Sequence, residues 1–302
     1  MINPLVPTEE AAALAGAVRA LCADHHATAT DPWAPGGFWD ALAAMGVLGL
    51  GSPDVGGGPA ELVAAHRELG RAGRAGPFAG AVVGSAVLPD DLRPAVADGT
   101  AIVSVTDGGT LAPWGAVATV FVELAPDGAW LCDPDGAPEP VPTLAGEPWA
   151  RLRLRRRHGL RGGPLAVQRA DLAVAAYLAA AGQATVATAA DYARQRRQFG
   201  RPIGDNQAVA HRLADAHMRL AAADNLVGMA AALQERQSGD AGPATAAARS
   251  SALAAALAAT YAAHQTAGAL GMAWEYPLGT RSVRIRQAGS LPPAAGSGAG
   301  GA

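Results

Sequence analysis

Two separate segments of the sequence carry residue types that could do chemistry. The first, residues 192–200, reads YARQRRQFG and continues as RPIGDNQ to Gln207. Arg194, Arg196 and Arg197 make it basic, and the charge and forked shape of arginine suit a phosphate or pyrophosphate group. The same arginines could instead only offset the dipole at the carboxyl end of a helix. On the residues alone, that structural interpretation is the more common outcome.

The second segment, residues 264–277, reads HQTAGALGMAWEYP. A helix is expected to run into Gln265, and Gly268 and Gly271 then break it or let another chain come close. Glu275 follows among Met272, Trp274, Tyr276 and Pro277. A lone glutamate after a helix is usually a solvated carboxylate. An apolar, aromatic setting would instead raise its pKa and make it a usable general base.

Long helices are predicted to position both segments. Apolar and alanine-rich stretches indicate helices at residues 167–197, 207–237 and 243–270, with a break at 238–242. The first helix is expected to end near Phe199, with Gly200 as its carboxyl-terminal cap and Pro202 blocking continuation. Three long antiparallel helices predict a bundle whose fourth member is short or comes from elsewhere.

The rest of the chain divides into a helical part and a small β part. Helical patterns cover residues 8–26, 38–45 and 60–72, and glycine-rich residues 46–58 predict a loop. Strands are expected at 101–106, 118–124, 129–132 and 152–154, with turns at 127–128 and 133–136. The predicted domains are a helical domain at 1–99, a reduced β domain at 100–157, a bundle at 158–288 and a disordered tail at 289–302.

Composition excludes several classes of function. The chain has 302 residues, a net charge of −3 and 50% hydrophobic residues, so it can bury a large core but offers no basic surface for nucleic acid or an anionic membrane. Cys22 and Cys132 fit neither a metal site nor a disulfide framework. No signal peptide or convincing membrane span is expected. These features predict a soluble cytoplasmic protein without a metal.

Taken together, the two chemical segments resemble the acyl-CoA dehydrogenase family. That family carries Y-x-x-x-R-x-Q/T-F-G, then P-[IL] and a Gln, and later Q-x-x-G-G-x-G-[YF]-x-x-E-[YH]-P. Ala269 and Met272 depart from the second pattern. An N-terminal resemblance covers residues 39–49, 52–57 and 67–71. The residues that match the two bundle motifs are Tyr192, Arg196, Gln198, Phe199, Gly200, Gln207, Gln265, Gly268, Gly271, Glu275, Tyr276 and Pro277.

The resemblance implies a fold, a cofactor and a reaction. The fold is mainly α, with an N-terminal helical domain, a middle β domain and a four-helix bundle. The family uses FAD to desaturate an acyl thioester at the α,β position, and Glu275 falls on the position of the catalytic base. The implied cofactor contacts, several of them to the FAD of a neighbouring subunit, are Arg196, Gln198, Phe199, Gln207, Gln265 and Gly268.

The departures from the family are concentrated where the chain would hold its own flavin. The T-E-P/x-x-G-S and W-I-T/S-N segments are missing between residues 100 and 157, and only TRSVRIRQAG follows Glu275. An arginine at the start of the first bundle helix is also unmatched, with Ala173 near that register.

Three interpretations remain open. The favoured one is a subunit of an FAD-dependent acyl-thioester dehydrogenase, paired with a fuller homologue as a dimer or α2β2 tetramer. The second is the same fold reused in a specialised pathway, on an acyl-CoA or an acyl-carrier-protein thioester. The third is a structural partner without its own flavin.

Overall fold

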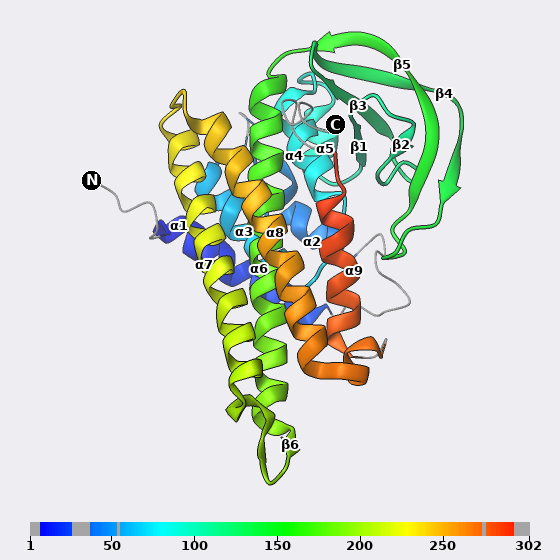
Figure 1. The fold of residues 1–302 in the computed structure, drawn as a ribbon. Coiled ribbons are helices and arrows are strands. Elements are labelled where there is room, and N and C mark those ends of the chain that lie inside the picture. The colour runs from blue at the N-terminus through cyan, green and yellow to red at the C-terminus, as the bar shows by residue number, and fades with distance from the viewer. Residues whose placement is uncertain (1–6, 26–36, 53–54, 274–275, 293–302) are drawn as a thin grey trace.

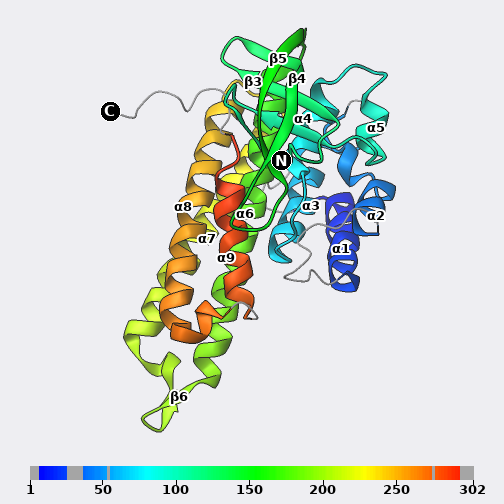
Figure 2. The same ribbon diagram turned by 90° about the vertical axis from the view of Figure 1, so that its right-hand side faces the viewer.

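A computed structural model describes residues 7–25, 37–52, 55–273 and 276–292. Figure 1 shows a long helical bundle with a twisted sheet beside one of its ends and a small hairpin at the other. Figure 2 shows a group of shorter N-terminal helices packed along the bundle, below the sheet. This arrangement confirms the predicted fold class, mainly helical with a small β part.

The N-terminal helices follow the sequence pattern closely. Thr8 caps α1, since its Oγ1 accepts a hydrogen bond from the amide of Ala11 at 3.1 Å. Glu61 similarly accepts from the amide of Gly58 at 2.6 Å, at the start of α3. The elements are α1 (Glu9–Asp24), α2 (Phe38–Ala44), η1 (Val47–Gly49), α3 (Pro59–Arg71), α4 (Phe78–Val87) and α5 (Arg93–Ala97).

Close backbone contacts join these helices to the rest of the molecule. A Cβ atom at Gly70 would lie 2.1 Å from the carbonyl oxygen of Tyr177 in the bundle, and one at Gly80 would lie 1.9 Å from that of Val103 in the sheet. Only glycine permits such approaches. The three predicted regions therefore pack around one shared core.

The sheet has five strands in the order β1-β3-β4-β5-β2. Strand β1 pairs with β3 in parallel, and the remaining neighbours are antiparallel. The strands are β1 (Val103–Thr106), β2 (Leu111–Ala112), β3 (Val120–Ala125), β4 (Gly128–Val141) and β5 (Trp149–Leu160).

The turn predicted at residues 133–136 is wrong. Strand β4 runs through this Pro/Gly-rich stretch, and a register shift between Asp135 and Glu139 absorbs the extra residues. The neighbouring strand supplies the reason, because its arginines lie opposite these acidic positions; Asp133 pairs with Arg155 and Asp135 with Arg153 in the register. The short strand expected at 152–154 is part of the longer strand β5.

The three long bundle helices are confirmed, and the expected short fourth member is α9. The bundle consists of α6 (Gly163–Gln195), α7 (Gln207–Glu235), α8 (Ala241–Ala267) and α9 (Pro277–Gly289), with η3 (Gly268–Met272) between the last two. Of the described helices, α6 alone is long and apolar enough to cross a membrane, yet 78% of its most apolar window is buried. It is the core helix of the bundle.

Two boundaries of the bundle differ from the prediction. The disordered tail was expected from residue 289, but α9 includes Gly289, and the Leu291 carbonyl accepts a hydrogen bond from Arg249 at 2.8 Å. Helix α6 ends at Gln195, not near Phe199. Gly200 is therefore no helix cap; it lies in the turn of a hairpin.

That hairpin is made by β6 (Arg197–Gln198) and β7 (Arg201–Pro202). Its two turn residues, Phe199 and Gly200, have φ angles of 51° and 80°. Two consecutive positive φ angles are what a tight two-residue hairpin needs. A short helix, η2 (Ile203–Asp205), then leads into α7.

Candidate functional site

The hairpin carries three of the predicted cofactor residues to the end of the bundle. Arg196, Gln198 and Phe199 are all exposed, and the Phe199 side chain is as open as in an extended peptide, at 101%. No described residue lies within hydrogen-bond or ion-pair distance of the Arg196 side chain. Figures 1 and 2 both place the hairpin, labelled β6, at the end opposite the sheet. These side chains thus project away from their own fold.

The other predicted cofactor residues also lie on the surface. Gln207 is the first residue of α7 and is exposed. Gln265 lies in the last turn of α8, and Gly268 ends that helix with a φ of 60°. Both are exposed. All six predicted cofactor residues are therefore described and open to solvent in the single chain.

Gln265 and Gly268 continue an exposed stripe along α8. Its members recur every three or four residues, which places them on one face of the helix. They are small or apolar for the most part, and Tyr261 is 66% exposed. The stripe consists of Ala247, Ser250, Ala254, Leu257, Tyr261, Gln265 and Gly268.

An aromatic contact brings the two chemical segments together. The rings of Tyr192 in α6 and Tyr276 at the start of α9 meet edge to face, with centroids 6.4 Å apart. Partial burial, the largest cause, raises the pKa of Tyr276. Nearby, His264 Nε2 lies 2.7 Å from Ser282 Oγ and ties α8 to α9. The sequence motifs thus meet in space although they are far apart in the chain.

Glu275, the predicted catalytic base, lies outside the described residues, as does Trp274. Its neighbour Tyr276 is half-buried against α6, whereas Met272, expected to be part of an apolar setting, is 76% exposed. The role of Glu275 stays a prediction.

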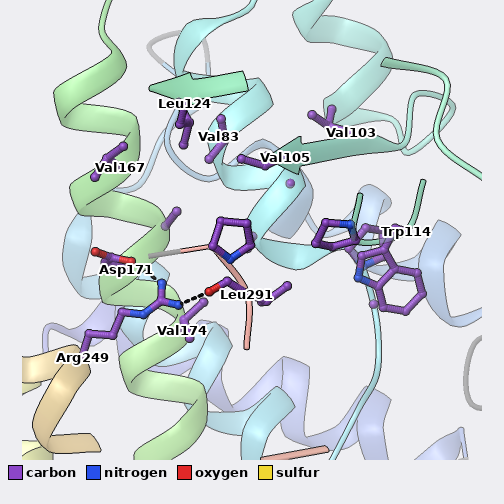
Figure 3. Close-up of a pocket in the computed structure, with 17 residues that line it drawn as sticks. Val83, Val103, Val105, Trp114, Leu124, Val167, Asp171, Val174, Arg249 and Leu291 are labelled. Carbon is purple, nitrogen blue, oxygen red and sulfur yellow. Dashed lines mark hydrogen bonds and ion pairs between the residues drawn. The ribbon is translucent and has the colours of Figure 1, made fainter. Parts of the chain in front are cut away.

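Between the sheet and the bundle lie two narrow adjoining cavities of about 40 Å³ each. Figure 3 shows the first, which is lined by valines from α4, β1 and α6 and has an ion pair at one side. Arg249 binds Asp171 through Nη1 and the Leu291 carbonyl through Nη2. Leu291 and Trp114 line both cavities. Such volumes hold a few water molecules and nothing larger.

A second buried ion pair lies at the junction between the sheet and the bundle, where it joins α9 to the loop before β5. Arg284 in α9 places Nη1 3.2 Å from Glu147 Oε1 in the loop before β5, and both side chains are under one-tenth exposed. Trp149 Nε1 donates to the other carboxylate oxygen at 3.1 Å. Burial raises the pKa of Glu147, and the charge of Arg284 opposes that shift. The pair fastens α9 directly to the sheet.

Comparison with known proteins identifies the family. Residues 162–297 match the model of the acyl-CoA dehydrogenase C-terminal domain. The chain is 30% identical over 244 residues to acyl-CoA dehydrogenase IpdE2 of Mycobacterium tuberculosis, covering 74% of this chain and 76% of the relative. The chain belongs to the acyl-CoA dehydrogenase family, a family of oxidoreductases that act on CH–CH groups.

Two further similarities show how much of each relative's length this chain covers. It is 34% identical over 227 residues to acyl-CoA dehydrogenase FadE34 of the same organism, which is 64% of this chain but 31% of FadE34. Its fold matches a chain of the ChsE4–ChsE5 complex from Mycobacterium tuberculosis with a TM-score of 0.83 at 22% identity, covering 97% and 96% of the two chains. This chain thus spans about a third of FadE34 but nearly all of the solved chain.

Members of this family bind FAD, and the two ends of this chain fit that cofactor differently. The exposed tip offers an unpaired guanidinium, amide groups and an aromatic ring, a donor set that suits a dinucleotide held by another chain. At the sheet, the two enclosed cavities hold only about 40 Å³ each, while a wider pocket of about 770 Å³ opens beside β3, β4, α6, α8 and the end of α9. The described residues therefore fit FAD at the tip.

The sequence patterns missed the buried polar groups of this junction. Glu147, Arg284, His66 and Arg74 are all buried, although nothing in their local sequence sets them apart from surface residues. In α9 the spacing of Leu278, Ser282 and Ile285 marks an inward face, but Arg284 lies off that face, so the pattern could not have placed it near the core.

Proposed function

We propose that this chain is one subunit of a hetero-oligomeric, FAD-dependent acyl-thioester dehydrogenase. The observation that carries the proposal is the exposure of all six predicted cofactor residues, at the tip of the bundle and along α8. Among the residues that the structure describes, no hydrogen bond or ion pair engages the Arg196 side chain, and the Phe199 ring is fully exposed. They are suited to complete a FAD site whose remaining walls belong to a partner.

The partner is proposed to be a fuller homologue that docks on the bundle. The α8 stripe of small and apolar residues lets a second helix approach closely. It leads directly to Gln265 and Gly268, so a chain seated on it would have its cofactor within their reach. The similarity to a chain solved in the ChsE4–ChsE5 complex supports pairing between two family members.

Each residue has a distinct task in this proposal. FAD, when bound, supplies the acceptor for the β-hydrogen of the acyl thioester, which leaves as hydride. Arg196 would balance the pyrophosphate charge, and Gln198 and Gln265 would hold the cofactor through their amides. Glu275 would take the α-proton onto its carboxylate, so that the C–H electron pair forms the new double bond. We place this reaction in cytoplasmic acyl-thioester metabolism.

A second candidate function is a partner subunit that completes the cofactor site without catalysing the reaction itself. The buried junction between α9 and the sheet favours it, because Arg284 and Glu147 bond to each other there within one chain. The two functions differ in whether Glu275 is needed for turnover.

The experiment is to purify the chain alone and with the homologue encoded beside it, and to record flavin absorbance. We expect the chain alone to be colourless and the pair to hold FAD. A colourless protein in both cases contradicts the dehydrogenase proposal and leaves a structural scaffold.

In the flavin-loaded pair, Glu275→Gln should keep FAD bound but abolish acyl-thioester-dependent bleaching of the flavin. Glu139→Gln, an exposed carboxylate on the sheet, is the matched control and should bleach normally. Wild-type bleaching rates in Glu275→Gln would exclude this residue as the base and favour the cofactor-completing role.

A further inference from the structure

A histidine lies at the end of α8, beside the two residues of that helix end that are predicted to contact FAD. His264 is in the last turn, directly before Gln265. Its carbonyl oxygen accepts a hydrogen bond from the amide of Gly268, and this bond closes the helix. Gly268 has φ and ψ angles of 60° and −137°, a conformation that favours glycine. The backbone of His264 therefore holds one of the predicted cofactor residues directly.

The side chain of His264 makes a second contact, to α9. Its Nε2 lies 2.7 Å from Oγ of Ser282, which is 6% exposed. Burial, with a further contribution from the charge of Arg286, lowers the pKa of His264, so the ring is neutral at about pH 7. A hydroxyl can donate or accept, and either neutral form of the ring can therefore make this bond. The bond joins the end of α8 to the middle of α9.

The turn that follows α8 packs against the same ring. Figure 1 shows α8 beside α9, with the η3 turn at the lower end of α8. A Cβ atom at Gly271 would lie 3.1 Å from His264 Nδ1 and 3.1 Å from the Cβ of Ala267. Glycine allows the backbone to come this close. Nδ1 is buried and has no hydrogen-bond partner among the described residues, so the bond to Ser282 alone fixes the polar edge of the ring.

The inner and outer sides of this turn differ. On the inner side, Gly271 and Ser282 are buried against His264. On the outer side, Gln265 and Gly268 are exposed. A turn whose inner side is fixed presents its outer side in one geometry, and less conformational freedom is lost when a ligand binds there. His264 is thus placed to set the geometry of two exposed residues while lying beneath them.

We propose that His264 is a positioning residue for FAD, whose bond to Ser282 holds residues 265–268 in the geometry that the cofactor requires. The inference rests on the proposed function, because it takes Gln265 and Gly268 to contact FAD in the two-subunit complex. It adds that a side chain directed away from the cofactor controls how tightly the cofactor is held. Loss of the bond therefore weakens FAD binding in the folded complex.

The test follows the release of FAD from the loaded two-subunit complex, by the recovery of flavin fluorescence after dilution. His264→Leu is similar in size but cannot bond to Ser282, and it should release FAD about tenfold faster than the wild type. Ser282→Ala should have the same effect. The double variant should release FAD no faster than either single variant, because both changes remove one and the same bond.

A conservative variant and a matched control separate positioning from stability. His264→Gln carries an amide that can bond to the Ser282 hydroxyl, and its release rate should lie within about twofold of the wild type. Thr260→Val is the control. Thr260 is 3% exposed, lies one turn earlier on the same face of α8, and donates to the Ala256 carbonyl of its own helix at 2.9 Å. Its replacement should leave FAD release at the wild-type rate, whatever its effect on the urea midpoint.

Equal release rates in His264→Leu and Thr260→Val overturn the inference. It is also overturned if His264→Gln releases FAD as fast as His264→Leu, because the effect then comes from the shape of the ring and not from the bond. If His264→Leu does not fold, Ser282→Ala, which loses a single oxygen atom, decides the question in the same way. A wild-type complex without FAD contradicts the dehydrogenase proposal together with this inference, whereas normal flavin content with unchanged release in both single variants contradicts this inference alone.

Discussion

The tip of the bundle and the junction between sheet and bundle use charged side chains in opposite ways. At the tip, Arg196 is exposed and has no ion-pair partner within the described part of the chain, and Phe199 lies open to solvent. At the junction, Arg284 and Glu147 are buried and bound to each other. Arg284 and Glu147 thus bind each other within one chain, whereas under the proposed function the tip would gain its contacts from another molecule.

Energetics sharpen this contrast. The two charges of a buried ion pair stabilise each other. Removing one partner leaves the other charge uncompensated in the interior. An exposed side chain contributes little to folding, so its removal affects only what binds to it. Changes at the two regions should therefore separate into effects on stability and effects on cofactor binding.

The largest effect is expected at the junction. Arg284→Leu should lower the free energy of unfolding by about 3 kcal/mol, since the buried Glu147 loses its counter-charge. The double variant Glu147→Leu/Arg284→Leu should recover most of the loss. Urea unfolding followed by tryptophan fluorescence measures both.

The exposed pair Arg151–Glu139, with N and O 3.7 Å apart, supplies the control. Arg151→Ala should cost less than about 0.5 kcal/mol, because exposed ion pairs contribute little. If Arg284→Leu is no more destabilising than Arg151→Ala, the Arg284–Glu147 pair does not hold the sheet and the bundle together.

A smaller effect is expected from pH at the same junction. Because burial lowers the pKa of His66 from 6.5 to about 4, the unfolded chain takes up this proton before the folded chain as pH falls. Stability is therefore full above about pH 6.5 and declines toward about pH 4. Between about pH 7 and pH 5 the wild type should lose about 2 kcal/mol more than His66→Phe. Parallel curves for the two proteins would mean that His66 is not kept neutral by burial.

At the tip, Arg196→Ala should leave unfolding unchanged and weaken FAD retention in the two-subunit complex by about tenfold, through loss of one charge-assisted contact. Flavin fluorescence released during dialysis measures the retention. Arg194→Ala is the matched control, because Arg194 lies on the same helix end but pairs with Asp191 at 2.5 Å. If Arg196→Ala retains FAD as well as the wild type does, Arg196 has no role in cofactor binding and only follows the end of its helix.

The smallest effect is expected at Phe199, which adopts a φ of 51° that non-glycine residues rarely take. Phe199→Gly should stabilise the isolated chain slightly, by up to about 1 kcal/mol, because glycine adopts this conformation without strain. The same change should weaken FAD retention in the complex several-fold. A loss of stability instead would show that Phe199 serves the fold of its own chain, and the contrast between tip and junction would fail.

Much of the fold followed from local sequence patterns. The three long helices arise from alanine-rich stretches with strong helix propensity, and their limits were correct within a few residues. The hairpin was missed because Gly200 after a helical stretch is equally typical of a helix cap. The turn predicted in β4 was wrong because pairing with the arginines of β5 outweighed the preference of proline and glycine for turns.

The sequence by itself determined the family motifs, the order of helices and strands, and the residues to be tested for cofactor binding, since these depend on neighbours close in the chain. Only the tertiary structure decided which of them face solvent and which polar groups are buried without a partner. Arg284 and Glu147 are separated by 137 residues, and His66 and Arg74 line a cavity together with residues of α6 and α9 from the other end of the chain. Burial and pairing depend on contacts between distant segments, and no local pattern records them.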